Sequence, residues 1–188
     1  MTAGGGSTVR MAMVSMLSAG GLVLFVFESF LPVLPWFRPG LGNIATILAL
    51  MMLGFGDALK VTVLRVTLGS LVLGRLFTPL FILAISGGLA SALVMAAVRK
   101  AGNRVFGPVG ISVAGAVAHN LVQIAAAYFI FVKSVELFIF LPFFMLAGVV
   151  TGILTGLVSA LVLDRIGTRF SGLAGSGTRP GNGEDSRG

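Results

Sequence analysis

Apolar residues in this chain gather in long runs, which short polar or glycine-rich segments interrupt. The runs predict helices at about residues 11–31, 41–55, 58–73, 77–98, 109–131 and 137–163. Most of them approach or exceed the roughly 20 residues that a helix needs to cross about 30 Å of hydrocarbon. Continuous runs of this length favour helices over the alternating strands of a membrane barrel. We therefore predict an all-α integral membrane bundle of about six transmembrane helices.

The ends of the chain differ in composition from the middle. Residues 1–9 are rich in Gly, Ser and Thr, and residues 169–188 are rich in Gly, Ser and Arg, so both predict disordered tails. Residues 10–168 form a single predicted transmembrane domain. Its first run, which begins at Met11, is too long for the apolar part of a signal peptide and lacks a clear cleavage site. Three prolines between residues 32 and 39 predict an irregular loop after it.

Basic residues are distributed unequally between the two sets of helix ends. Six spans place both termini on one side of the membrane. With the N-terminus inside, the inner flanks hold Arg10, Lys60, Arg99, Lys100, Arg104, Arg165 and Arg169, and the outer flanks hold Arg38, Arg75 and Lys133. This bias follows the positive-inside rule, so we predict a multi-pass protein of the cell inner (cytoplasmic) membrane with both termini in the cytoplasm. Residues 41–55 are short for a full crossing, and a re-entrant hairpin with the next helix would leave both termini on the same side.

Composition supports this class and excludes others. The 188 residues are 56% hydrophobic and only 10% charged, with a mean hydropathy of +1.06, whereas globular domains are about 25% charged. The chain has no cysteine, which excludes disulfides, iron–sulfur clusters and thiolate metal sites. Its formal net charge of +7 comes from scattered residues between apolar runs, which favours anchoring at the cytoplasmic side over nucleic-acid binding.

The segment from Gly110 to Gln123 carries a polar stripe. At about 100° per residue, one helical sector roughly 140° wide collects several small or polar residues, namely Ser112, Gly115, Ala116, His119, Asn120 and Gln123. The opposite sector holds Ile111, Val113, Leu121, Val122, Ala125 and Ala126. Polar groups at membrane depth must find partners or line a cavity. His119 is either a packing residue or a proton carrier or substrate contact, and the neighbouring amides could recognise a polar group of a ligand.

Three further polar residues fall in or near predicted helices. Arg65 is about 10 Å from the cytoplasmic end of its helix, where it either snorkels to the headgroups or forms a buried ion pair or an anion site. Glu28 lies near the outer end of the first helix, and Asn43 lies in a glycine-rich entry to the second. The predicted ligand-binding set is His119, Asn120, Gln123, Asn43, Arg65 and Glu28.

Signatures of catalysis are missing from the sequence. It has no pair of neighbouring carboxylates, no Asp-rich cluster for magnesium and diphosphate, and no phosphate-binding loop. A metal site is disfavoured because there is one histidine, and because Glu28 and Asp57 belong at opposite ends of the membrane. We therefore predict no catalytic residue, no metal, no cofactor and no ATPase, and we expect that the protein is not an enzyme.

The last predicted helix carries Gly148, Gly152, Gly156 and Ala160 at four-residue spacing. Small residues at this spacing form a ridge that lets another backbone approach closely. The ridge predicts packing within the chain, with docking of a partner protein as the alternative.

Four segments together resemble the Gx transporter family, which is also labelled heptaprenyl diphosphate synthase component I. They are Leu41–Leu50, Leu64–Ser70, Ser86–Ser91 and Gly110–Gln123. The resemblance covers roughly Met13 to Arg165, and its most specific part is the His-Asn-x-x-Gln pattern of His119, Asn120 and Gln123.

That family is similar to the substrate-binding S components of energy-coupling-factor (ECF) transporters. The resemblance implies six helices, a cavity open to the outer face, and reliance on a separate transmembrane coupling subunit with ATPases. S components dock through an Ala-x-x-x-Ala element in their first helix, where this chain has Ser15-x-x-x-Ala19.

Two functional hypotheses follow. In the first, the chain is a membrane-embedded subunit of an uptake transporter that captures a small vitamin-like or isoprenoid-like ligand, possibly anionic, from outside. In the second, it is a non-catalytic accessory subunit of polyprenyl diphosphate or quinone synthesis. The first requires a ligand-sized cavity above His119 on the outer side, and it predicts that His119→Ala and Gln123→Ala weaken ligand binding without unfolding the protein.

Overall fold

The computed structural model describes residues 3–30, 40–102, 106–133 and 135–175. Within them the chain forms six α-helices: α1 (Ala3–Glu28), α2 (Asn43–Leu53), α3 (Phe55–Val72), α4 (Pro79–Ala101), α5 (Pro108–Ala127) and α6 (Leu141–Gly175). A π-helical turn, η1 (Tyr128–Val132), and a 3₁₀ helix, η2 (Val135–Phe140), connect the last two. No strand occurs in these ranges, and the predicted all-α class is confirmed.

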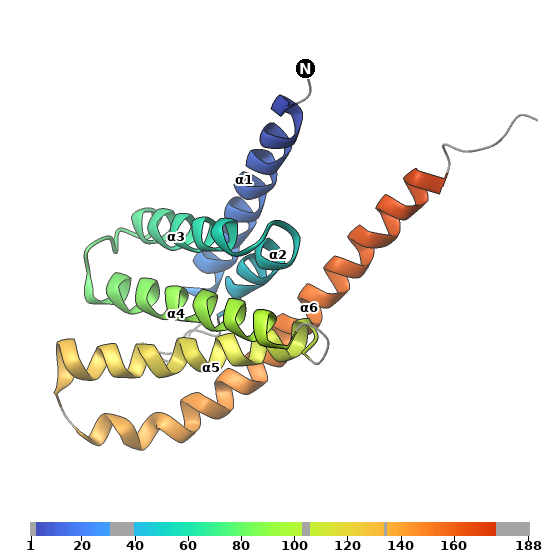
Figure 1. Ribbon diagram of the computed structural model, residues 1–188. Helices are drawn as coiled ribbons and strands as arrows, with labels where there is room; N and C mark the ends of the chain where they lie inside the picture. Colours follow the sequence, from blue (N-terminus) through green and yellow to red (C-terminus); the bar gives the residue numbers. More distant parts are fainter. Residues whose placement is uncertain (1–2, 31–39, 103–105, 134, 176–188) are drawn as a thin grey trace, which may run out of the picture.

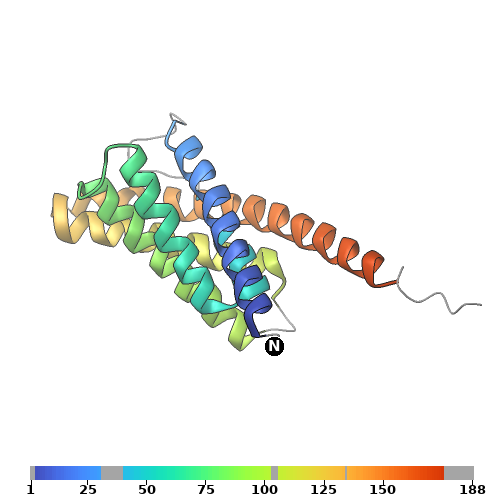
Figure 2. The same cartoon turned by 90° about the horizontal axis from the view of Figure 1, so that it is seen from above.

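Helices α3, α4 and α5 lie side by side in chain order, each running opposite to the next (Figure 1). The first half of α6 continues this row beside α5, and its second half extends past the other helices (Figure 2). Helix α1 packs against α3 and α2. Because short connections join α3 to α4 and α4 to α5, the row follows directly from the order of the apolar runs.

The short helix α2 occupies the centre of the bundle. It contacts each of the other five α-helices, and seven of its eleven residues are buried. Its apolar side chains form a core with residues from α3, α4 and α5, including Val61, Met95 and Ile111. At about 1.5 Å per residue, α2 is about 16 Å long, so it reaches only about half-way across a bilayer.

Four helical segments are long and apolar enough to cross a membrane: Ser7–Glu28, Pro79–Ala101, Pro108–Phe131 and Glu136–Ile166. The protein is therefore a multi-pass membrane protein. Helix α2 is too short to cross alone, as its run of residues indicated, and α3 carries Asp57, Lys60 and Arg65. The pair α2–α3 is thus the part of the bundle that differs from a simple set of six spans.

Glycines bring α6 against the backbone of α5. A Cβ added to Gly152 would lie 2.7 Å from Val113 Cα, and one added to Gly156 would lie 2.6 Å from Val109 Cα. A Cβ on Gly148 would lie 2.7 Å from the amide nitrogen of Asn120. The four-residue ridge therefore packs within the chain, as the sequence predicted, and it gives α5 and α6 their close approach.

The first and last helices extend into the segments that were predicted as tails. Helix α1 begins at Ala3, inside the stretch 1–9, and α6 continues to Gly175, beyond the predicted boundary at 168. Adding a residue to an existing helix requires no new nucleation, so a helix can extend past the residues that packing fixes. The proline loop at residues 32–39 and the chain beyond 175 lie outside the described residues.

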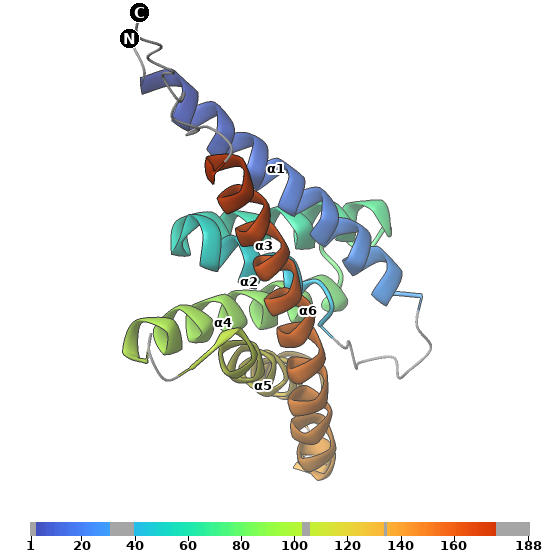
Figure 3. The ribbon, with the colours of Figure 1, turned by 90° about the vertical axis from the view of Figure 1, so that its right-hand side faces the viewer.

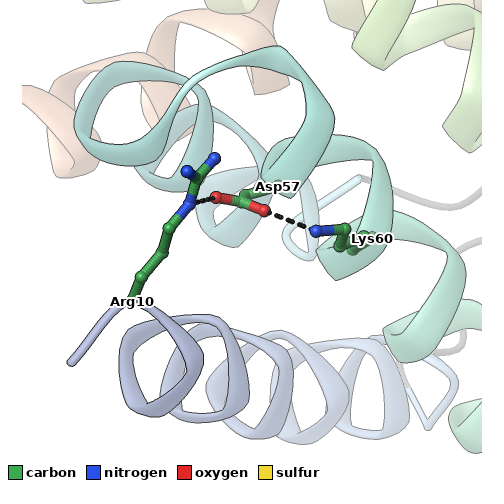
Figure 4. Close-up of polar contacts among 3 residues, drawn as sticks. All are labelled: Arg10, Asp57 and Lys60. Atoms are coloured by element: carbon green, nitrogen blue, oxygen red, sulfur yellow. Dashed lines mark hydrogen bonds and ion pairs between the residues drawn. The ribbon is translucent and has the colours of Figure 1, made fainter. Parts of the chain in front are cut away.

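The first turns of α1 and the last turns of α6 lie at the same end of the bundle (Figure 3). At that end Asp57, in the first turn of α3 and outside the four spans, accepts hydrogen bonds from Arg10 and from Lys60, the latter at 3.0 Å (Figure 4). These donors, Lys60 foremost, hold the pKa of Asp57 below its ordinary value of 3.8. The pairs join α1 to α3.

Gly152→Ala tests the packing of α6 on α5. The added methyl has no room against the Val113 backbone, so we expect the free energy of unfolding to fall by about 1–3 kcal/mol. The matched control is Gly20→Ala on α1, where a Cβ would meet nothing within 4 Å and where alanine favours the helix. Unfolding curves in one detergent compare the two variants, and equal stability of Gly152→Ala and wild type would contradict the packing.

Candidate functional site

The polar stripe of α5 is the buried face of that helix. Its predicted members Ser112, His119, Asn120 and Gln123 are all buried, and the Ser112 hydroxyl lies 2.7 Å from that of Thr155 on α6. In the opposite sector, which the sequence allows to face lipid or apolar neighbours, Leu121 is exposed and Ile111 is buried in the apolar core around α2. The periodicity therefore identified the buried polar face.

His119 packs against a glycine of α4. A Cβ added to Gly87 would lie 3.0 Å from both Cε1 and Nδ1 of the imidazole, and 2.9 Å from Cγ of Gln123. The Ser86-Gly-Gly88 element thus makes the space that the histidine ring fills. This contact agrees with a packing role for His119, and a role as proton carrier or substrate contact stays a prediction.

The two amides beside His119 join three helices. Asn120 donates a hydrogen bond from Nδ2 to the carbonyl oxygen of Phe144 on α6, at 2.7 Å. Gln123 donates from Nε2 to the carbonyl oxygen of Leu83 on α4, at 3.4 Å. Both bonds use amide nitrogens, and the amide carbonyl oxygens take no part in them. These oxygens are hydrogen-bond acceptors beside the cavity described next.

A cavity of about 480 Å³ lies between α4, α5, η2 and the start of α6. It is lined by Pro79, Leu80, Leu83, Asn120, Gln123, Ile124, Ala127, Phe131, Leu137, Phe140 and Phe144. The lining is apolar apart from the two amides and contains no charged side chain. Its residues come from the start of α4, the end of α5 and the start of α6, which is the end of the bundle opposite the first turns of α1.

A π-helical turn contributes Phe131 to the wall of this cavity. After Ala127 the chain forms η1, and Lys133 then takes a left-handed conformation with φ 46°. The Tyr128 ring packs at 5.1 Å from that of Phe129 and at 5.2 Å from that of Phe138 on η2. Such turns occur often at functional sites. No feature of the sequence distinguishes this π turn from continued α-helix, and the predicted helix to residue 131 passed through it.

The other three predicted residues form a separate cluster around the start of α2. Arg65 on α3 donates from a terminal guanidinium nitrogen to Asn43 Oδ1 at 2.7 Å, and the two residues are 3% and 2% exposed. Glu28, which is 5% exposed, accepts a hydrogen bond from the backbone nitrogen of Gly40. Its charge acts favourably on that of Arg65. Arg65 is therefore a buried, partnered cation rather than a snorkelling one.

Three glycines enclose the Arg65 side chain. A Cβ on Gly42 would lie 2.0 Å from a terminal guanidinium nitrogen, and one on Gly21 would lie 3.1 Å from Cδ. A Cβ added to Gly88 of α4 would lie 4.0 Å from the other terminal nitrogen of Arg65. The close fit indicates that this cluster holds α1, α2, α3 and α4 together.

Helix α4 separates the two clusters. Gly87 faces His119 and Gln123 of α5, whereas Gly88, one residue on, faces Thr62 and Arg65 of α3. The six predicted residues therefore do not form one pocket: Asn120 and Gln123 line the cavity, and Glu28, Asn43 and Arg65 lie around the start of α2. Among the described residues, no group of three His, Cys, Asp or Glu side chains is placed to hold a metal ion.

Residues 17–162 match the family described as heptaprenyl diphosphate synthase component I. The chain belongs to that family. The match includes α2 to α5, the second half of α1 from residue 17 and α6 as far as residue 162, and therefore both polar clusters and the cavity. No curated protein and no solved structure matches the chain.

Arg65→Met tests the cluster at the start of α2. Removing the cation leaves the Glu28 carboxylate and the Asn43 amide buried without their partner, so we expect a loss of about 3 kcal/mol in the free energy of unfolding. Adding Glu28→Gln removes the uncompensated charge and should restore part of the loss. Unfolding titrations of the single and double variants provide the measurement, and a single variant as stable as wild type would show that Arg65 does not hold the bundle.

Proposed function

We propose that this protein is the substrate-binding membrane subunit of an uptake system, similar to the S component of an ECF transporter. It takes a small, largely apolar ligand from the outer face into the cavity between α4, α5 and α6. The observation that carries the proposal is the cavity itself. Its volume falls within the range of roughly 300–1,000 Å³ that is typical of small-molecule sites.

The lining defines the ligand class. Apolar and aromatic side chains form the walls, and the amides of Asn120 and Gln123 provide the polar groups. Sites of this composition bind ligands with an apolar body and one or two hydrogen-bonding groups. Arg65, the cation that would favour an anion, belongs to the other cluster. The cavity therefore favours a neutral, isoprenoid-like molecule over an anionic one.

Topology relates the cavity to the two sides of the membrane. The cavity lies at the end of the bundle opposite the first turns of α1 and the basic residues Arg99 and Lys100 of α4. With the basic end in the cytoplasm, as the positive-inside rule favours, the cavity faces outward from the cell inner membrane. This placement suits capture from outside.

Energy for uptake would come from other chains, a transmembrane coupling subunit and its ATPases. Helix α1 offers a place for the coupling subunit, because Ser15 and Ala19 are exposed and Gly20 has open space where a side chain would be. Small residues on a lipid-facing helix let a partner helix approach closely. In this proposal α1 is the docking helix.

The family description favours a second candidate function, a non-catalytic accessory subunit of polyprenyl diphosphate synthesis. An accessory subunit would bind a soluble prenyl synthase and would need no ligand of its own. The two candidates are distinguished by whether filling the cavity abolishes small-molecule binding while leaving partner binding intact.

Ala127→Phe tests the cavity, with the neutral isoprenoid alcohol farnesol as the probe. The phenyl ring would occupy the volume beside Gln123, so we expect the affinity for farnesol to fall at least about tenfold, which is about 1.4 kcal/mol. Equilibrium binding to the purified protein in detergent gives the affinities. Farnesyl diphosphate should bind more weakly than farnesol, because the lining holds no cation.

The matched control is Ala12→Phe on α1, which adds the same ring at an exposed position that lines neither hollow of the bundle. It should bind farnesol as wild type does. Equal affinity of Ala127→Phe and wild type would place the ligand elsewhere and would favour the accessory-subunit function.

A further inference from the structure

A second hollow lies at the opposite end of the bundle from the cavity. It is an open groove of about 450 Å³ between the end of α2, the start of α3 and the last turns of α4. Its walls include Leu50, Phe55, Leu93 and Ala97, of which Phe55 and Leu93 are well exposed. The groove is therefore an apolar surface that faces the surroundings of the protein rather than its core.

Two adjacent cations, Arg99 and Lys100, complete the lining of this groove. The Arg99 guanidinium is fixed in place, because it donates hydrogen bonds to the carbonyl oxygens of Leu50 and Met51 at the end of α2. The Lys100 side chain is exposed. No acidic side chain is among the groove's lining residues, and Asp57, which follows Phe55 by two residues, is already paired with Arg10 and Lys60.

We propose that this groove binds an anionic phospholipid. The phosphate pairs with Lys100 and Arg99, and an acyl chain lies along the apolar walls. Charge complementarity selects the headgroup: a site with two cations and no acid attracts a phosphodiester and gains less from a zwitterionic lipid. Basic pockets between helices at the membrane surface bind lipid headgroups in this way.

The walls explain why the partner is a lipid rather than a soluble anion. Inorganic phosphate would pair with the cations and make no contact with the apolar walls at Phe55, Leu93 and Ala97. A phospholipid covers the apolar walls and the cations together. The groove also lies at the end of α4, a membrane-spanning helix, where a headgroup is found.

Native mass spectrometry of the full chain, delipidated and then titrated with phosphatidylglycerol or phosphatidylcholine of equal chain length, tests the proposal. Wild type should bind phosphatidylglycerol more tightly. Lys100→Gln should lower that affinity about fivefold, as expected for one basic residue near a headgroup, and should leave phosphatidylcholine binding unchanged. Ala97→Phe fills the groove and should weaken the binding of both lipids.

The matched control is Lys133→Gln, which removes an exposed lysine at the opposite end of the bundle and should change neither affinity. Equal binding of the two lipids by wild type would overturn the proposal. So would a Lys100→Gln protein that keeps the preference, or a Lys133→Gln protein that loses it to the same degree, since either result assigns the preference to overall charge. If Ala97→Phe does not fold, the two lysine variants alone decide between these outcomes.

Discussion

A helix that ends inside a membrane protein needs partners for backbone groups that water would otherwise satisfy. Helix α2 meets this requirement at both ends. At its start, the backbone nitrogens of Asn43, Ile44 and Ala45 donate to the carbonyl oxygens of Gly40, Leu41 and Gly42, and Arg65 holds the Asn43 side chain. At its end, Arg99 donates hydrogen bonds to the carbonyl oxygens of Leu50 and Met51. The backbone nitrogen of Gly54 donates to the carbonyl oxygen of Ala49. Because α2 contacts all the other α-helices, these contacts position the whole bundle.

Around α2, glycine determines how closely the longer helices approach and where they separate. Between α5 and α6 the glycine ridge brings backbones together, and between α4 and α5 Gly87 makes room for His119. Where the ridge ends, before Gly148, the large side chains of η2 and early α6 replace small ones, and a cavity lined by Phe140 and Phe144 opens. Close packing and the candidate ligand site are thus two consequences of one pattern of residue size along α6.

The length of the apolar runs was sufficient to predict the all-α class. Periodicity was sufficient to predict the buried face of α5 and the packing of the glycine ridge, because each depends on spacing along one helix. It could not show that α4 divides the polar residues into two clusters. That division depends on which helix packs against each face of α4, because Gly87 faces α5 and Gly88 faces α3. For the same reason, the depth of Arg65 in its helix could not decide whether its side chain snorkels to the headgroups or forms a buried ion pair or an anion site. The π turn η1 and the groove beside Arg99 also required three-dimensional structure, because each involves residues that no single-helix pattern connects.

The central claim is a ligand cavity that opens on the outer side of the membrane, and cysteine labelling in intact cells tests it most directly. The chain has no native cysteine, so each single-cysteine variant reports the accessibility of one position. The variants are Ala127→Cys in the cavity, Lys133→Cys at the same end of the bundle and Lys100→Cys at the opposite end. With a membrane-impermeant maleimide, the account predicts labelling of Lys133→Cys and Ala127→Cys from outside, with Lys100→Cys labelled only after permeabilisation. Labelling of Ala127→Cys only after permeabilisation, while Lys133→Cys reacts from outside, would contradict it.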